Sequence, residues 1–170
     1  MRINGSFFKV NASFTVQDVE LINKVCSYAS GYTDLCRSTL TARPESRAAD
    51  LTKLMTLSVD NAVAYGRGNH NEVGNLATKV PDTTVRRMMV YCRDLYKESN
   101  EDALDAMGVA NLGSLADALR RISEAITGVQ QCGAGLEKLG RLRSPFAVAT
   151  NEKQLGLLNI ASVLITLALK

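Results

Sequence analysis

Apolar side chains recur every three or four residues along most of the chain, and no segment alternates as a β-strand would. This spacing predicts two short helices, from Val16 to a stop at Gly31 and from Asp34 to Leu40. It also predicts four longer helices. Their expected limits are Ser46 to about Gly66, Asp82 to Gly108, Ser114 to Cys132, and Gln154 to Leu169.

Residues with a special backbone role mark the expected ends of these helices. Polar residues that can accept backbone hydrogen bonds precede the apolar runs, and we expect them to act as N-caps. The candidate caps are Thr15, Ser46, Asp82 with Thr83, and Ser114. Residues 68–71 are expected to break or bend the third helix, and residues 144–146 to form a loop.

The predicted fold is all-α, an up-down-up-down four-helix bundle preceded by a helical hairpin. We expect the hairpin over residues 16–45 and the bundle over residues 46–170, which together make one domain of residues 16–170. Residues 1–15 show no helical period and are interpreted as a tail, either native or added.

The composition agrees with a helical bundle and argues against two classes of partner, nucleic acids and membranes. Hydrophobic residues make up 46% of the chain but aromatic residues only 5%, so aliphatic side chains must fill the core. The net charge is only +3 with scattered cations, which argues against nucleic acid as a partner. No apolar run reaches the roughly 18 residues of a membrane span, so we expect no membrane association.

Catalytic motifs are missing from the sequence. It contains no phosphate-binding glycine loop, no HExxH and no GxSxG. The single histidine, His70, lies in a glycine- and asparagine-rich stretch and is interpreted as an exposed loop residue. We therefore expect no enzyme activity, no cofactor and no metal site.

Four cysteines are present, at positions 26, 36, 92 and 132. Their even number, the absence of CxxC and the single histidine favour disulfides over a zinc site. Four cysteines allow three pairings, and spacing alone does not choose among them. The alternative is four buried free thiols in a cytosolic protein.

Acidic residues collect on one side of the helix that contains Cys92. At 100° per residue, four carboxylates fall at about 160–220° from the apolar stripe, with Asp102 near the edge. These four are Asp94, Glu98, Glu101 and Asp105. A solvated helix face is one interpretation. A docking surface for a basic protein is the other, because like charges one turn apart destabilise a helix unless a partner compensates.

These features together resemble one plant inhibitor family, over roughly residues 16–170. The resemblance lies in the four cysteine positions and in three segments around them: RPESRAADL followed by LSVDNA (residues 43–51 and 57–62), YCRDLY (91–96), and SPF (144–146) before an apolar last helix. The family comprises pectin methylesterase inhibitors, invertase inhibitors and related pollen allergens.

The resemblance implies several properties that the residues alone leave open. It implies bridges Cys26–Cys36 and Cys92–Cys132, secretion to the plant cell wall (apoplast), and a monomer or weak homodimer. It further implies inhibition by covering the active-site cleft of a target enzyme in a 1:1 complex, without catalysis.

Two segments bear on the choice of target. Invertase inhibitors are similar in having a Pro-Lys-Phe loop about sixteen residues before the fourth cysteine, where this chain has Leu-Ala-Asp at 115–117. The resemblance therefore favours pectin methylesterase as the partner, with acid invertase, or a non-inhibitory allergen-like bundle, as alternatives. It implies that the partner-binding residues are Asp94, Glu98, Glu101 and Asp102. Gln131 and residues 133–135, which we expect to form a small, flexible run, depart from the polar contacts that the family places around the fourth cysteine.

Overall fold

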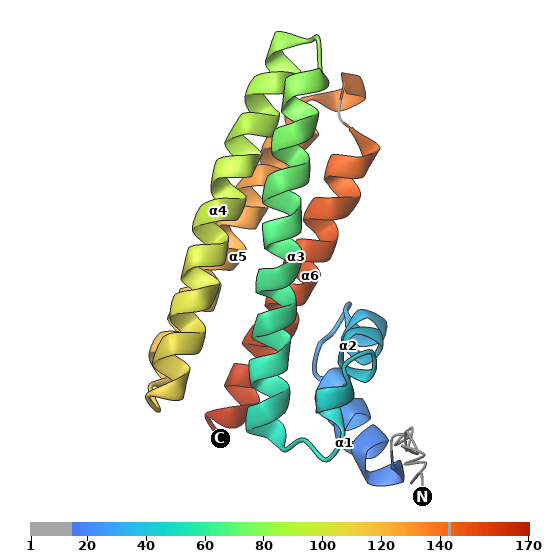
Figure 1. Cartoon of the computed structure of the whole chain (residues 1–170), viewed down its shortest axis with the longest axis vertical. Helices are drawn as coiled ribbons and strands as arrows, with labels where there is room; N and C mark the ends of the chain where they lie inside the picture. Colours follow the sequence, from blue (N-terminus) through green and yellow to red (C-terminus); the bar gives the residue numbers. More distant parts are fainter. Residues whose placement is uncertain (1–14, 143) are drawn as a thin grey trace, which may run out of the picture.

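The computed structural model describes residues 15–142 and 144–170, and within these ranges all regular structure is helical. Two short helices, α1 (Val16–Ser27) and α2 (Thr33–Thr41), form an N-terminal hairpin. Four long helices form the bundle (Figure 1): α3 (Leu51–Lys79), α4 (Thr83–Asn111), α5 (Leu115–Lys138) and α6 (Pro145–Ala168). The predicted four-helix bundle with a helical hairpin is confirmed.

Short connections make consecutive bundle helices antiparallel, which gives the up-down-up-down order. Each helix packs against two neighbours: α4 lies between α3 and α5, and α6 closes the ring between α5 and α3. Short 3₁₀ turns occur before α3 (Pro44–Ser46) and before α6 (Gly140–Leu142). The hairpin lies beside one end of the α3–α6 pair.

Several helix starts follow the capping chemistry of the sequence. Thr15 and Asp18 form a reciprocal capping box at α1. The Asp82 carboxylate accepts hydrogen bonds from the backbone N–H groups of Thr84 and Val85 at α4. These contacts satisfy donors that the first turn of a helix leaves without intrahelical partners.

Two disulfides staple this architecture, in the pairing that the family resemblance implied. Cys26 and Cys36 join α1 to α2, with their Cα atoms 5.5 Å apart. Cys92 and Cys132 join α4 to α5, with their Cα atoms 4.9 Å apart. All four are fully buried, and the described part of the chain contains no free cysteine.

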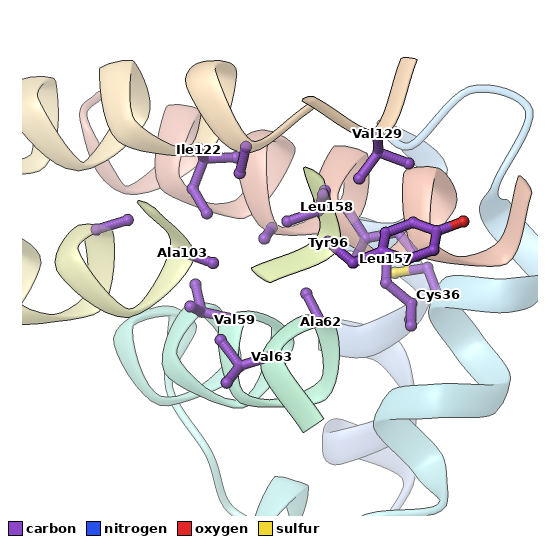
Figure 2. Packing of buried hydrophobic residues seen from close by; sticks show 14 of the residues in the cluster. Cys36, Val59, Ala62, Val63, Tyr96, Ala103, Ile122, Val129, Leu157 and Leu158 are labelled. Carbon is purple, nitrogen blue, oxygen red and sulfur yellow. The ribbon is translucent and has the colours of Figure 1, made fainter. Parts of the chain in front are cut away.

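The core runs along the bundle axis and is mainly aliphatic (Figure 2). Figure 2 shows contributions from every bundle helix, including Val59 of α3, Ile122 and Val129 of α5, and Leu158 of α6. Tyr96 of α4 is the largest fully buried side chain, and its hydroxyl donates to Asn151 Oδ1 at 3.0 Å. This hydrogen bond satisfies the polar end of a side chain whose ring fills the core.

Several predicted helix boundaries are wrong because local signals were weaker than packing; α5, for example, continues past Cys132 to Lys138. The helix α3 does not stop near Gly66 or break at residues 68–71, since it continues to Lys79. Gly66 is instead buried against Asn100 and Gln154, where a side chain would clash. The helix α4 likewise continues past Gly108 to Asn111, and the chain turns at Gly113, whose φ of +85° suits glycine.

The last helix begins nine residues earlier than predicted. The segment 144–146 is not a loop, because Ser144 is the N-cap of α6 and Pro145 is its first residue. Proline is favoured at that position, where no N–H is needed.

Two of the predicted caps also behave differently. Ser46 ends a 3₁₀ turn and is buried, and the α3 cap is Asp50, whose carboxylate accepts from the Lys53 N–H at 2.8 Å. Ser114 does precede α5, but its hydroxyl donates to the Asp117 carboxylate instead of capping the backbone.

Candidate functional site

The acidic stripe predicted from helix geometry lies on the outer face of α4. Cys92, Tyr96 and Ala103 are buried on the inner side of the helix. The stripe carboxylates occupy the other side: Asp94, Glu98, Glu101 and Asp105 are exposed, while Asp102 is half-buried. We call these five residues the acidic face.

One edge of the acidic face borders a groove between α4 and α5. The groove has a volume of about 240 Å³, and Glu98 and Asp102 line it from α4. Across from them, α5 contributes Glu124, Thr127 and Gln131. Three carboxylates from two helices therefore converge on one shallow, solvent-open groove.

Glu124 is a site residue that the sequence did not reveal. Its carboxylate contacts Arg121 at 3.2 Å and Arg120 at 2.8 Å, and Arg121 also contacts Asp102 at 3.6 Å. The spacing of Glu124 from these arginines is typical of ordinary ion pairs on a solvated helix. Glu124 lies next to Asp102 only because of the register between α4 and α5. That register cannot be predicted from a single sequence.

The groove perturbs the ionisation of Asp102. Partial burial raises the pKa of this carboxyl, and the neighbouring charges of Glu124, Asp105 and Glu98 raise it further. Arg121 opposes these effects without cancelling them. Burial and like-charge repulsion together therefore outweigh the positive charge placed against Asp102.

The other carboxylates of the acidic face differ in how far they are neutralised. Arg93 donates twice to the same Asp94 oxygen, at 2.9 and 2.7 Å. Lys97 lies 3.7 Å from Glu101, with both side chains more than 60% exposed. Glu98 and Asp105 are exposed and make no ion pair or hydrogen bond with the described residues. These two carboxylates are thus the most available negative charges on the face.

The segment around the fourth cysteine divides between two sides of α5. Gln131 lines the α4–α5 groove, whereas Gly133 and Ala134 line a separate groove of about 320 Å³ between α5 and α6. The glycines are not a flexible run. They lie within α5 at close helix contacts, where a side chain at Gly135 would meet the Met88 sulfur.

His70 does not lie in an exposed loop, as the sequence suggested. It lies within α3 and is half-buried. Its Nδ1 is 3.0 Å from the Arg93 backbone oxygen on α4. The continuation of α3 through the glycine-rich stretch places the ring against the neighbouring helix.

Metal sites and membrane spans are absent from the described ranges. No cluster of three or more His, Cys, Asp or Glu side chains among residues 15–142 and 144–170 is placed to hold a metal ion. Within the same ranges, no helix has the length and apolar character needed to cross a bilayer.

Comparison with known proteins identifies the family. The model of the family described as plant invertase/pectin methylesterase inhibitor matches residues 20–169, from within α1 to the end of α6. The chain belongs to this family. Both disulfides and the whole acidic face lie within the matched range.

Solved structures of family members share the fold. A mutant form of a pectin methylesterase inhibitor from Arabidopsis superposes with a TM-score of 0.73 at 20% identity, covering 85% of this chain and 95% of that one. A pectin methylesterase inhibitor from Arabidopsis thaliana gives a TM-score of 0.62 at 19% identity, covering 86% and 95%. No curated protein sequence matches the chain. At these identities the similarity shows the fold alone.

Proposed function

We propose that this chain is a secreted inhibitor of pectin methylesterase that acts in the plant cell wall. It would dock with its acidic face on a basic surface of the esterase and cover the pectin-binding cleft in a 1:1 complex. The observation that supports this most is the convergence of Glu98, Asp102 and Glu124 at the α4–α5 groove. Carboxylates gathered in this way destabilise an isolated protein and favour a cationic partner.

The proposed mechanism is steric, with charge setting partner choice. Long-range attraction between the acidic face and a basic enzyme speeds association, and contacts around the groove then hold the complex. No residue of the inhibitor needs to react. Membership of a family whose members include pectin methylesterase inhibitors supports the target, and secretion is proposed on the same ground.

Acid invertase is the second candidate target. The segment at residues 115–117, which replaces the Pro-Lys-Phe loop of the invertase inhibitors, forms the regular first turn of α5. A helical turn of this kind offers no protruding loop to fill a cleft, so the geometry favours the esterase.

An inhibition panel tests the proposal directly. The purified protein is titrated against pectin methylesterases and acid invertases, with esterase inhibition at 1:1 stoichiometry expected. Inhibition of invertase alone would reassign the target, and inhibition of neither enzyme would leave a non-inhibitory bundle.

A charge-reversal pair tests the surface. The double variant Glu98→Lys, Glu101→Lys is expected to lose inhibition while keeping its helical circular dichroism. Glu137→Lys with Glu152→Lys makes the same charge change at the α5–α6 groove and serves as the matched control. Equal loss in both variants would show that net charge, not the acidic face, governs inhibition.

A further inference from the structure

A second groove lies on the other side of α4, between α3 and α4. It has a volume of about 320 Å³. Its lining is polar and comes from both helices: Arg67, His70 and Asn71 of α3, and Lys97, Asn100, Glu101 and Leu104 of α4. In contrast to the α4–α5 groove, two cations face one carboxylate here.

Both cations are available to a ligand. Arg67 is exposed and makes no ion pair or hydrogen bond with the described residues. Lys97 has only the 3.7 Å contact with Glu101, in which both side chains are mostly in solvent. Exposed ion pairs of this kind contribute little to stability, so their side chains can readily change partners. A ligand carboxylate between Arg67 and Lys97 would therefore replace a weak contact with a stronger one.

The groove also has a fixed hydrogen-bond acceptor on His70. The Arg93 carbonyl can only accept, so the contact at 3.0 Å requires the proton on Nδ1 of the neutral ring. The other ring nitrogen, Nε2, is then an acceptor. A backbone contact fixes the orientation of this half-buried ring before any ligand arrives.

Asn100 also lines the groove, but only 6% of this residue is exposed. Its Oδ1 is buried against Gly66 and is therefore not open to a ligand. The groove thus combines two cations, which suit a carboxylate, with one oriented acceptor on His70, which suits a hydroxyl group.

We propose that the α3–α4 groove binds a uronate unit of an acidic oligosaccharide, with Arg67 and Lys97 on its carboxylate and with His70 accepting from one of its hydroxyls. Among such sugars we choose galacturonate, and this choice rests on the proposed function, because galacturonate units are what a pectin methylesterase leaves behind. An inhibitor with this site is retained on pectin that its target has already de-esterified.

A titration with tetragalacturonate in the presence of a calcium chelator tests the groove without any esterase. Amide resonances of the lining residues are followed by two-dimensional NMR, and saturable shifts with a dissociation constant on the order of 1 mM are expected for so open a groove. The fully methyl-esterified tetramer, which lacks the carboxylates, is expected to produce no such shifts. Equal shifts with both sugars, or no saturable shifts with either, would overturn the proposal.

Three variants separate this site from general electrostatics. Arg67→Gln with Lys97→Gln is expected to weaken tetragalacturonate binding at least about tenfold. Lys53→Gln with Lys138→Gln, which removes the same charge elsewhere, should have less than about a twofold effect. Glu101→Gln removes the carboxylate that competes for Lys97, so it is expected to tighten sugar binding while weakening esterase inhibition. Equal losses in the two double variants, or weaker sugar binding by Glu101→Gln, would overturn the site.

Failure of this inference is distinguishable from failure of the proposed function. Esterase inhibition without tetragalacturonate binding overturns the sugar site and leaves the inhibitor intact. Binding of the tetramer without esterase inhibition overturns the proposed inhibitor function and leaves the sugar site intact. If the Arg67 and Lys97 variant loses esterase inhibition and no sugar binds, the groove receives a carboxylate of the enzyme, and the sugar proposal is wrong.

Discussion

Two glycines in the same helix should respond oppositely to alanine. Gly66 and Gly68 lie two residues apart in α3, so both have the same helical backbone conformation. They point in different directions and differ in the atoms packed against them. A side chain at Gly68 would meet no atom within 4 Å. A side chain at Gly66 would meet Asn100 Oδ1 at less than contact distance and the Gln154 Nε2 at 2.9 Å.

The expected magnitudes follow from these surroundings. Alanine in place of an exposed helical glycine stabilises by about 0.5–1 kcal/mol, which is the expectation for Gly68→Ala. Gly66→Ala gains the same backbone term but adds overpacking, which costs about 1–3 kcal/mol. Gln154 cannot easily move away, because its amide donates to the Ala62 carbonyl and accepts from Asn69. We therefore expect Gly66→Ala to destabilise by about 1–2 kcal/mol.

Urea unfolding followed by circular dichroism measures both variants against the parent protein. The difference between Gly66→Ala and Gly68→Ala isolates the packing cost, because the helix propensity change is common to both. A midpoint raised by Gly68→Ala and lowered by Gly66→Ala is the expected result. Equal stabilisation by the two substitutions would show that α3 does not approach α4 and α6 closely at Gly66.

Three further outcomes are expected. Replacing Cys92 and Cys132 by alanine opens a loop with a sequence separation of 40, which corresponds to about 4 kcal/mol of chain entropy and is measurable by urea unfolding. Asp18→Asn removes the carboxylate that accepts from the Ala48 N–H at 2.7 Å. Hydrogen bonds from Thr15 and Ala48 lower the pKa of Asp18, so its stabilisation is present above its unfolded pKa of about 3.9 and is lost as the pH falls through the lower folded value. Unfolding midpoints should therefore differ between Asp18→Asn and the parent near neutral pH and converge in strong acid. Asp102→Asn is expected to raise the melting temperature near neutral pH but not in strong acid, and to weaken esterase inhibition.

Local patterns in the sequence were enough to predict the helical architecture. The apolar stripe of α4 predicted which side faces the core, and the acidic face followed from the same periodicity. Caps such as Thr15 and Asp82 could be read because a capping side chain acts within three residues of itself. Each of these predictions depends on neighbours in sequence, so one chain contains the necessary information.

Features that depend on packing between helices could not be predicted in this way. A glycine is a weak helix former, and only the close approach of Asn100 and Gln154 explains why position 66 of a continuous helix requires one. For the same reason the sequence did not predict Glu124 as a site residue, because its approach to Asp102 depends on the α4–α5 register. The cysteine pairing was open on spacing alone and was decided correctly by the family resemblance.

The ionisation of Asp102 links the stability of the bundle to its proposed role. An aspartate with a raised folded pKa is charged near neutral pH at a cost to the fold, and that cost disappears once the pH falls below the unfolded value. Asp102→Asn removes the repulsion from Glu124 and Glu98, although it also gives up the 3.6 Å contact with Arg121. Because the direction of the shift shows that burial and repulsion outweigh this contact, the isolated protein gains stability from the substitution. The substitution has the opposite effect on binding, because the negative charge of Asp102 attracts a cationic partner. A rise in melting temperature together with a loss of inhibition is therefore the signature of a docking surface, whereas a face without a partner would show the rise in melting temperature alone.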